Sequence, residues 1–137
     1  MTPSKPPSRY TILVVDDSPE YQKILSRIIQ SAGYKLFTAR SAEEAEQALS
    51  VRVPDVALLD WNLPGKSGLE LAQRFRQDPR CSRMILIMLS VHSRPQEQAQ
   101  GLTEGKVNMY LTKPVNPAEL LARIDGLLKK RDQPPPQ

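Results

Sequence analysis

The chain has 137 residues, of which 39% are hydrophobic and 25% charged, a length and composition typical of one globular domain. A single cysteine, Cys81, excludes a disulfide framework and is compatible with a reducing compartment. The sequence has no apolar run near the roughly 18 residues that span a membrane, and no apolar segment that would act as a secretory signal. We therefore expect a cytoplasmic protein that does not enter a membrane.

The net charge of +4 is concentrated at the two ends of the chain. The rest of the chain is neutral once six charged residues of the ends are set aside, namely Lys5, Arg9, Lys129, Lys130, Arg131 and Asp132. Aromatic residues make up only 5% of the chain, too few for a surface on which bases stack between cations. These features predict no direct contact with nucleic acid.

Both ends are also rich in proline, which favours extended, unpacked chain. We expect a disordered N-terminal tail over residues 1–9, one folded domain over residues 10–131 and a proline-rich tail over residues 132–137. No separate output domain fits in this sequence, so we expect either a protein that acts alone or one piece of a longer chain.

The folded part begins with a continuous apolar run at residues 11–15, typical of a strand buried on both faces. Ser18 and Pro19 are a suitable N-cap and first residue for a helix, and Gly33 is suitably placed to end it. The apolar face of this helix consists of Tyr21, Ile24, Leu25, Ile28 and Ile29. A second strand is predicted at residues 35–39.

The middle of the chain repeats this alternation. The sequence SAEE at residues 41–44 is a capping box that opens a helix to about Leu49. An apolar strand at residues 56–59 ends at Asp60, and the turn-rich loop at residues 62–68 leads into a short helix.

The last part contains two more strand–helix pairs. A strand at residues 84–89 ends at Ser90, and a weakly apolar helix is predicted at residues 96–104. A short strand at residues 109–111 precedes a helix that begins with the sequence NPAE at residues 116–119. This (βα)5 order predicts an α/β fold, with a doubly wound, flavodoxin-like sheet of five parallel strands in the order 2-1-3-4-5.

Polar residues follow four of the predicted strands: Asp16 and Asp17, Asp60, Ser90, and Lys113. The carboxyl ends of parallel strands share one edge of the sheet, so these side chains should lie close together. Three neighbouring carboxylates repel one another unless a cation lies among them, and Mg²⁺ prefers oxygen ligands and often shares a phosphate. The pattern predicts a phosphoryl-transfer site in which an aspartate can be the nucleophile.

Four segments carry a resemblance to a known family: VVDD at residues 14–17, LLDWNLPGKSG at 58–68, LS at 89–90 and YLTKP at 110–114. The chain resembles the receiver domains of two-component response regulators, of the single-domain chemotaxis type that illustrates the order 2-1-3-4-5. The resemblance covers about residues 10–129.

The resemblance implies a phosphorelay function. Asp60 would accept a phosphoryl group from phosphohistidine on a histidine kinase or a histidine phosphotransfer protein, forming an aspartyl phosphate. Asp17, Asp60 and the main-chain carbonyl of Asn62 would hold Mg²⁺, for which Mn²⁺ is expected to substitute, and Asp16 would contribute through water. The protein would catalyse only its own phosphorylation and dephosphorylation, so we expect a signalling receiver rather than an enzyme.

The resemblance also implies a switch. Ser90 would hydrogen-bond the new phosphoryl oxygens, and Lys113 would pair with Asp60 and then with the phosphoryl group. Tyr110 would move inward with Ser90 and alter a face that binds a downstream protein target. The Lys113–Pro114 bond is expected to be cis.

Two positions, Val91 and Lys106, depart from the family's pattern. Val91 follows Ser90, where the family usually has a small residue, so Val91 is expected to narrow access to the phosphoryl site. Lys106 stands where alanine is usual. His92 varies in the family and is expected to be a solvated loop residue.

Other phosphate-binding classes fit less well. A P-loop ending at Gly65 would need a glycine where Asp60 stands. A phosphatase of the haloacid-dehalogenase type needs a second aspartate two residues after the first, and flavodoxin needs a phosphate loop after the first strand; neither is present. The alternative that stays open is a receiver fold that recruits partners without being phosphorylated.

Overall fold

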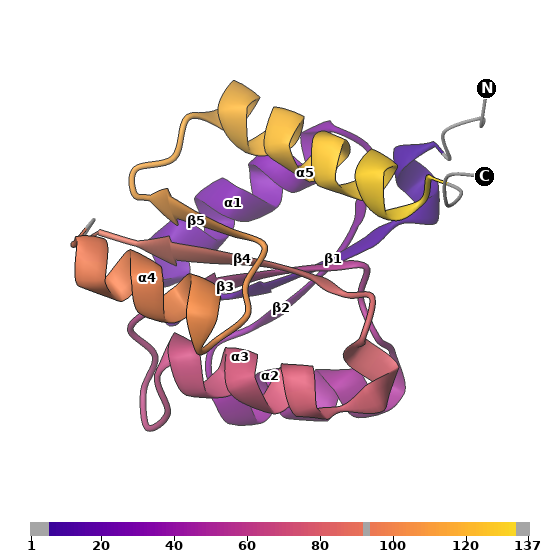
Figure 1. Ribbon diagram of the computed structural model, residues 1–137. Coiled ribbons are helices and arrows are strands. Elements are labelled where there is room, and N and C mark those ends of the chain that lie inside the picture. Colours follow the sequence, from indigo (N-terminus) through magenta and orange to yellow (C-terminus); the bar gives the residue numbers. More distant parts are fainter. Residues whose placement is uncertain (1–5, 92–93, 134–137) are drawn as a thin grey trace.

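A computed structural model describes residues 6–91 and 94–133 of the chain (Figure 1). One sheet of five parallel strands has the order β2-β1-β3-β4-β5. Its strands are β1 (Thr11–Val15), β2 (Lys35–Ala39), β3 (Val56–Asp60), β4 (Ile85–Ser90) and β5 (Met109–Thr112). The predicted fold class and strand order are therefore confirmed.

Among the described residues, four α-helices connect the strands and a fifth follows β5. Figure 1 shows α1 and α5 over one face of the sheet and α2 and α3 over the other. The helices are α1 (Pro19–Ser31), α2 (Ala42–Val51), α3 (Gly68–Gln77), α4 (Pro95–Thr103) and α5 (Pro117–Arg131). Helix α4 packs beside the edge strand β5. No helix among the described residues is long and apolar enough to cross a membrane.

Side-chain caps fix where the helices begin. Ser18, Ser41 and Asn116 each accept a hydrogen bond from the amide three residues later, as their sequence positions predict. Ser67 caps α3 in the same way, so this helix begins inside the turn-rich loop at Gly68 and runs to Gln77. Gly33 has a φ of +92°, which is the left-handed conformation of a residue that ends a helix.

The core has two layers, one on each side of the sheet. Strands β1, β3 and β4 are buried along their whole length because helices cover both of their faces, which explains their continuous apolar sequences. The edge strands β2 and β5 are partly exposed. The two layers hold the sheet rigidly, so the residues at its carboxyl edge have fixed relative positions.

The described ends of the chain have local structure. Pro7–Arg9 form an exposed 3-10 turn before β1. Asp132 accepts a hydrogen bond from the Tyr10 hydroxyl at 2.7 Å and pairs with Arg131, so it belongs to the folded domain. Burial and the hydrogen bond to Asp132 raise the pKa of Tyr10 to about 12. Residues 1–5 and 134–137 of the predicted tails lie outside the described residues.

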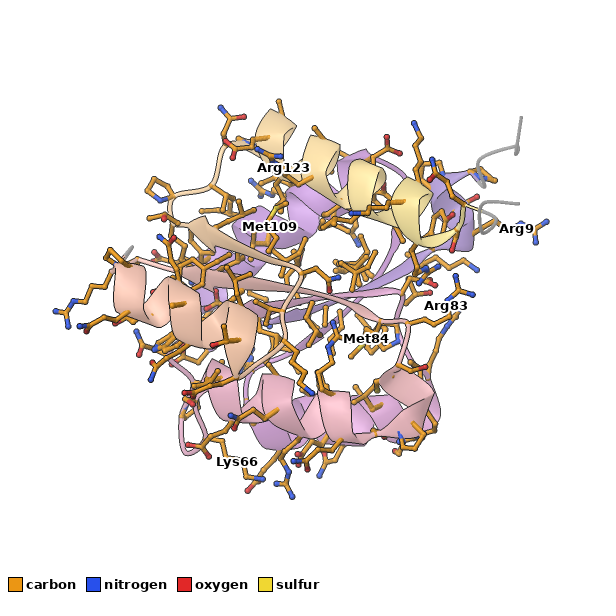
Figure 2. All side chains as sticks on the ribbon, in the orientation of Figure 1. Arg9, Lys66, Arg83, Met84, Met109 and Arg123 are labelled. Carbon is orange, nitrogen blue, oxygen red and sulfur yellow. The ribbon has the colours of Figure 1, made fainter. Side chains whose placement is uncertain are left out.

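Both described ends of the chain lie at the amino-terminal edge of the sheet. Figure 2 shows Arg9 and Arg83 at this end of the molecule. Arg83 lies 3.6 Å from Asp132, and Arg131 lies 3.1 Å from Asp55. The basic residues at this end are thus partly neutralised by aspartates, and they lie at the opposite end of the strands from Asp16 and Asp60.

Candidate functional site

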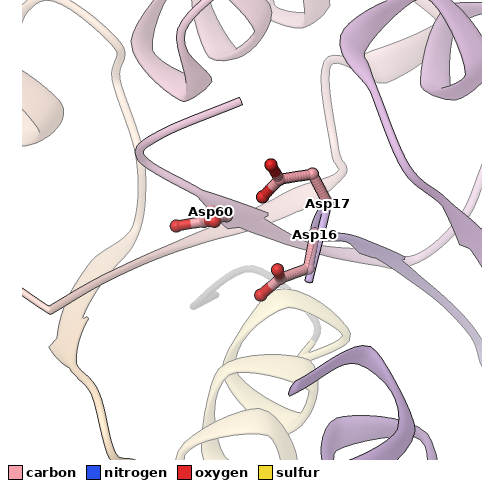
Figure 3. A group of neighbouring side chains, drawn as sticks. All are labelled: Asp16, Asp17 and Asp60. Carbon is pink, nitrogen blue, oxygen red and sulfur yellow. The ribbon is translucent and has the colours of Figure 1, made fainter. Parts of the chain in front are cut away.

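Three carboxylates meet at the carboxyl edge of the sheet (Figure 3). Asp16 and Asp17 directly follow β1, and Asp60 ends the neighbouring strand β3. One oxygen from each lies within 4.8 Å of the others. Asp16 is 1% exposed and Asp60 7% exposed, whereas Asp17 is exposed to solvent. The predicted acidic cluster is therefore present, with Asp17 on its open side.

Lys113 brings a positive charge to these carboxylates from the end of β5. Its side chain is 8% exposed, and its Nζ lies 2.7 Å from Asp16 Oδ2 and 3.4 Å from Asp60 Oδ1. The expected pairing with Asp60 is therefore present but is the longer of the two, and the shorter contact is to the more deeply buried Asp16. The Lys113–Pro114 bond is cis, as predicted.

The pocket disfavours a charged Asp60. Burial is the main cause that raises the pKa of Asp60, and the nearby Asp16 carboxylate raises it further. The Lys113 ammonium and the Asn62 amide, which donates to Asp60 Oδ1 at 3.4 Å, oppose this rise only in part. Among the described residues, the two ion pairs of the pocket both use Lys113. One ammonium facing three carboxylates leaves a net negative pocket that suits a divalent cation.

Asp16 and Asp60 differ in how their oxygens are occupied. Asp16 Oδ1 accepts the Ser18 amide at 2.9 Å, and Asp16 Oδ2 accepts Lys113. Lys113 and the Asn62 amide both contact Oδ1 of Asp60, and Oδ2 receives no hydrogen bond from the residues that the structure describes. Asp60 Oδ2 is thus the carboxylate oxygen of the buried pair that is available for a new bond.

The loop after Asp60 depends on close backbone approach at Gly68. A Cβ placed on Gly68 would lie 2.2 Å from the main-chain oxygen of Asp60. Any other residue at this position would therefore push the start of α3 away from the end of β3. The Gly68 amide donates to the Trp61 carbonyl at 2.8 Å. This closed loop holds Asn62 beside Asp60 at the mouth of the pocket.

Ser90 and Tyr110 connect the pocket to the face formed by α4 and β5. Ser90 is fully buried, and its carbonyl accepts the Lys113 amide at 2.7 Å. Tyr110 shares a side-chain hydrogen bond with Ser90, and its hydroxyl lies 3.4 Å from Glu97 Oε2 on α4. Its half-buried ring lies 6.1 Å from the ring of Trp61, centre to centre. Burial raises the pKa of Tyr110, so the phenol stays protonated near neutral pH.

The two positions that depart from the family's pattern lie in different surroundings. Val91 directly follows β4 and is 59% exposed. Lys106 is exposed, has a φ of +51° and lies in the loop between α4 and β5. His92 lies outside the described residues.

Two residues of α1 contact the site although their sequence positions gave no indication of it. The Gln22 side chain donates to the carbonyls of Asp16 and Ala39, at 3.3 and 3.0 Å, and so joins the ends of β1 and β2. Tyr21, expected only on the apolar face of the helix, lies against Lys113. Both contacts join segments far apart in the sequence, which local patterns do not reveal.

Comparison with known proteins decides the family. Residues 12–125 match the response regulator receiver domain. The chain belongs to the receiver-domain family of two-component response regulators. The predicted membership is therefore confirmed.

Two curated relatives are transcriptional regulators. The receiver is 38% identical over 120 residues to the phosphate regulon transcriptional regulatory protein PhoB of Pseudomonas aeruginosa, covering 88% of this chain and 52% of that protein. It is 36% identical over 125 residues to the DNA-binding dual master transcriptional regulator RpaA of Synechocystis sp., covering 90% of this chain and 51% of that protein. The chain thus spans about half the length of these relatives.

Solved receiver structures match over nearly their whole length. A CheY-like receiver domain protein from Methanospirillum hungatei is 28% identical with a TM-score of 0.83, covering 90% of this chain and 96% of that one. The chemotaxis protein CheY4 of Vibrio cholerae is 29% identical with a TM-score of 0.81, covering 86% of this chain and 98% of that one.

Substitution of Asp60 by asparagine tests the electrostatics of the pocket. Without Mg²⁺, Asp60→Asn should raise the free energy of unfolding at pH 7, because it removes a buried charge that the fold disfavours. A raised pKa means that the folded protein holds the Asp60 proton more tightly than the unfolded chain does. The stability that this proton adds to the folded wild type is fully present below the unfolded-state pKa of about 3.9. It is lost as the pH rises through the folded-state pKa.

The gain in the free energy of unfolding of the Asp60→Asn variant should therefore shrink as the pH falls toward the unfolded-state pKa. Urea denaturation of wild type and variant across this range measures it. Asp125→Asn, at an exposed position on α5, is the control and should show no such gain. An Asp60→Asn variant less stable than wild type at pH 7 would contradict the raised pKa.

Proposed function

We propose that this receiver accepts a phosphoryl group on Asp60 from phosphohistidine of a histidine kinase or a histidine phosphotransfer protein. The observation that carries the proposal is the position of Asp60: it is nearly buried, Lys113 holds its Oδ1, and the described residues leave its Oδ2 without a hydrogen bond. Asp60 Oδ2 would attack phosphorus as the P–N bond to the donor imidazole breaks. The electron pair of that bond stays on the imidazole nitrogen, which takes up a proton.

We propose that the reaction depends on Mg²⁺, or on Mn²⁺ in its place. The donor set fits such an ion, because three carboxylates offer hard oxygen ligands within 4.8 Å of one another. Asp17, Asp60 and the main-chain carbonyl of Asn62 would hold the ion, and it would neutralise the charge on the phosphoryl oxygens. Asp16 would act through water, which its two occupied carboxylate oxygens support.

The remaining residues of the pocket would change their contacts when Asp60 is phosphorylated. Lys113 would move its ammonium to the new phosphoryl group, and the Ser90 hydroxyl would turn toward it. Since Ser90 shares a hydrogen bond with Tyr110, this change would shift Tyr110 and its contact with Glu97 on α4. The face of α4 and β5 would then bind a downstream protein target. We propose that the exchange takes place in the cytoplasm and that this domain itself does not bind nucleic acid.

Labelling with a small phosphoryl donor tests the function. The protein is incubated with acetyl phosphate and Mg²⁺, and its intact mass and the modified residue are measured. We expect one added phosphoryl group, on Asp60. The label should be absent in the Asp60→Asn variant or when EDTA removes the metal, and present in the Asp125→Asn control.

A wild-type mass that stays unchanged in Mg²⁺ would favour the alternative, a receiver fold that recruits partners without phosphorylation. Equal labelling of the Asp60→Asn variant would show that another residue is the acceptor.

Val91 is proposed to restrict access to the phosphoryl group. Its two methyl groups are stiff at χ1, so they would hinder both a small donor and the water that hydrolyses the aspartyl phosphate. Val91→Ala should speed phosphorylation by acetyl phosphate and dephosphorylation alike, by about tenfold, equivalent to about 1.4 kcal/mol of barrier. Val51→Ala, at a position 88% exposed at the end of α2, is the matched control. Decay of the Val91→Ala phosphoprotein at the wild-type rate or slower would mean that Val91 does not restrict the pocket.

A further inference from the structure

The aromatic ring of Tyr21 lies beside the ammonium of Lys113. The Lys113 Nζ is 4.3 Å from the centre of the Tyr21 ring. Tyr21 is the third residue of α1, and its amide donates to the Ser18 cap at 3.2 Å. The cap therefore fixes the backbone of Tyr21 in the first turn of α1, close to Asp16 and Asp17. The ring of Tyr21 reaches across to Lys113 at the end of β5.

This ring completes the surroundings of the ammonium. A lysine ammonium has three N–H donors. Two acceptors for them are Asp16 Oδ2 at 2.7 Å and Asp60 Oδ1 at 3.4 Å, and the π face of Tyr21 is the third neighbour. The Lys113 side chain is only 8% exposed, and a cation over a ring is attracted more strongly when little water surrounds it.

The Tyr21 hydroxyl holds the backbone on the far side of Pro114. It accepts a hydrogen bond from the Val115 amide at 3.0 Å. Proline has no amide proton, so Val115 carries the first donor after Lys113. Tyr21 thus contacts both the side chain of Lys113 and the loop that follows it, with two different parts of one residue.

We propose that Tyr21 is a positioning residue for Lys113. Its ring holds the ammonium between Asp16 and Asp60, and its hydroxyl fixes the loop from which Lys113 projects. The ammonium is then already beside Asp60 when a phosphoryl group arrives, so no part of the barrier is used to bring it there. This inference rests on the proposed phosphorylation of Asp60.

The first test is spectroscopic and needs no phosphorylation. Protons above an aromatic ring resonate upfield, so the ε-methylene protons of Lys113 should be shifted upfield in the wild type. Tyr21→Leu should remove this shift, and Tyr21→Phe should keep it. Tyr21→Phe should also speed hydrogen exchange of the Val115 amide, because that amide loses its acceptor. Unchanged ε-methylene shifts in the Tyr21→Leu variant would overturn the proposal.

The second test is kinetic and uses a double-mutant cycle. At saturating Mg²⁺, Tyr21→Leu should slow phosphorylation by acetyl phosphate about fivefold, the size expected of a lost cation–π contact. Tyr21→Phe keeps the ring and loses only the hydrogen bond to Val115, so it should slow phosphorylation less than Tyr21→Leu. In a Lys113→Met background, Tyr21→Leu should cause no further slowing. Tyr34→Leu, which removes a buried tyrosine ring at the other end of the sheet, is the control for general loss of packing.

The outcomes distinguish the positioning of Lys113 by Tyr21 from the phosphorylation of Asp60. Equal slowing by Tyr21→Leu with and without Lys113 would show that Tyr21 acts through the fold and not through the ammonium. If the wild type takes up no phosphoryl group, the proposed function fails, and the proton shifts of Lys113 still decide whether Tyr21 positions it. If Tyr21→Leu does not fold, Tyr21→Met takes its place in both tests.

Discussion

The repulsion among three carboxylates at one edge of the sheet is the interaction on which the site depends. Asp16 and Asp60 are nearly buried, so water screens their charges weakly, and burial together with Asp16 raises the pKa of Asp60. A single ammonium, that of Lys113, contacts both. The pocket is therefore attractive to a further cation, and any anion that enters, such as a phosphoryl group, must be accompanied by positive charge.

The fold brings these charges together and also holds them in place against their repulsion. In a parallel sheet every strand points the same way, so the residues that follow β1, β3, β4 and β5 meet at one edge. Helix caps at Ser18 and Ser67 begin α1 and α3 immediately beyond the pocket. The short loops between strand and cap leave the acidic side chains little freedom, which keeps them together despite their repulsion. Gly68 makes one of these loops possible, because the Asp60 carbonyl occupies the space of a side chain.

The sequence predicts most of this arrangement, because the fold and the acidic edge depend on local patterns. Apolar runs, caps and the polar residue after each strand are all visible within a few neighbours, as for Asp60 after residues 56–59. The contacts that were not predicted join distant segments. The preference of Lys113 for Asp16, the position of Tyr21 over Lys113 and the bond between Tyr10 and Asp132 depend on how helices pack across the sheet. Tyr21 fits the apolar face of a helix equally well, so its periodicity could not reveal its second role.

The stability of the protein in rising concentrations of Mg²⁺ tests the central claim most directly, namely that the acidic edge is short of positive charge. The free energy of unfolding is measured by urea denaturation at pH 7, for wild type and for Asp60→Asn. Wild type should become more stable as the ion binds, by about 2.7 kcal/mol at a concentration 100 times its Kd. Asp60→Asn, which has less charge to neutralise, should gain less. Equal stability of the wild type with and without saturating Mg²⁺ would contradict the account.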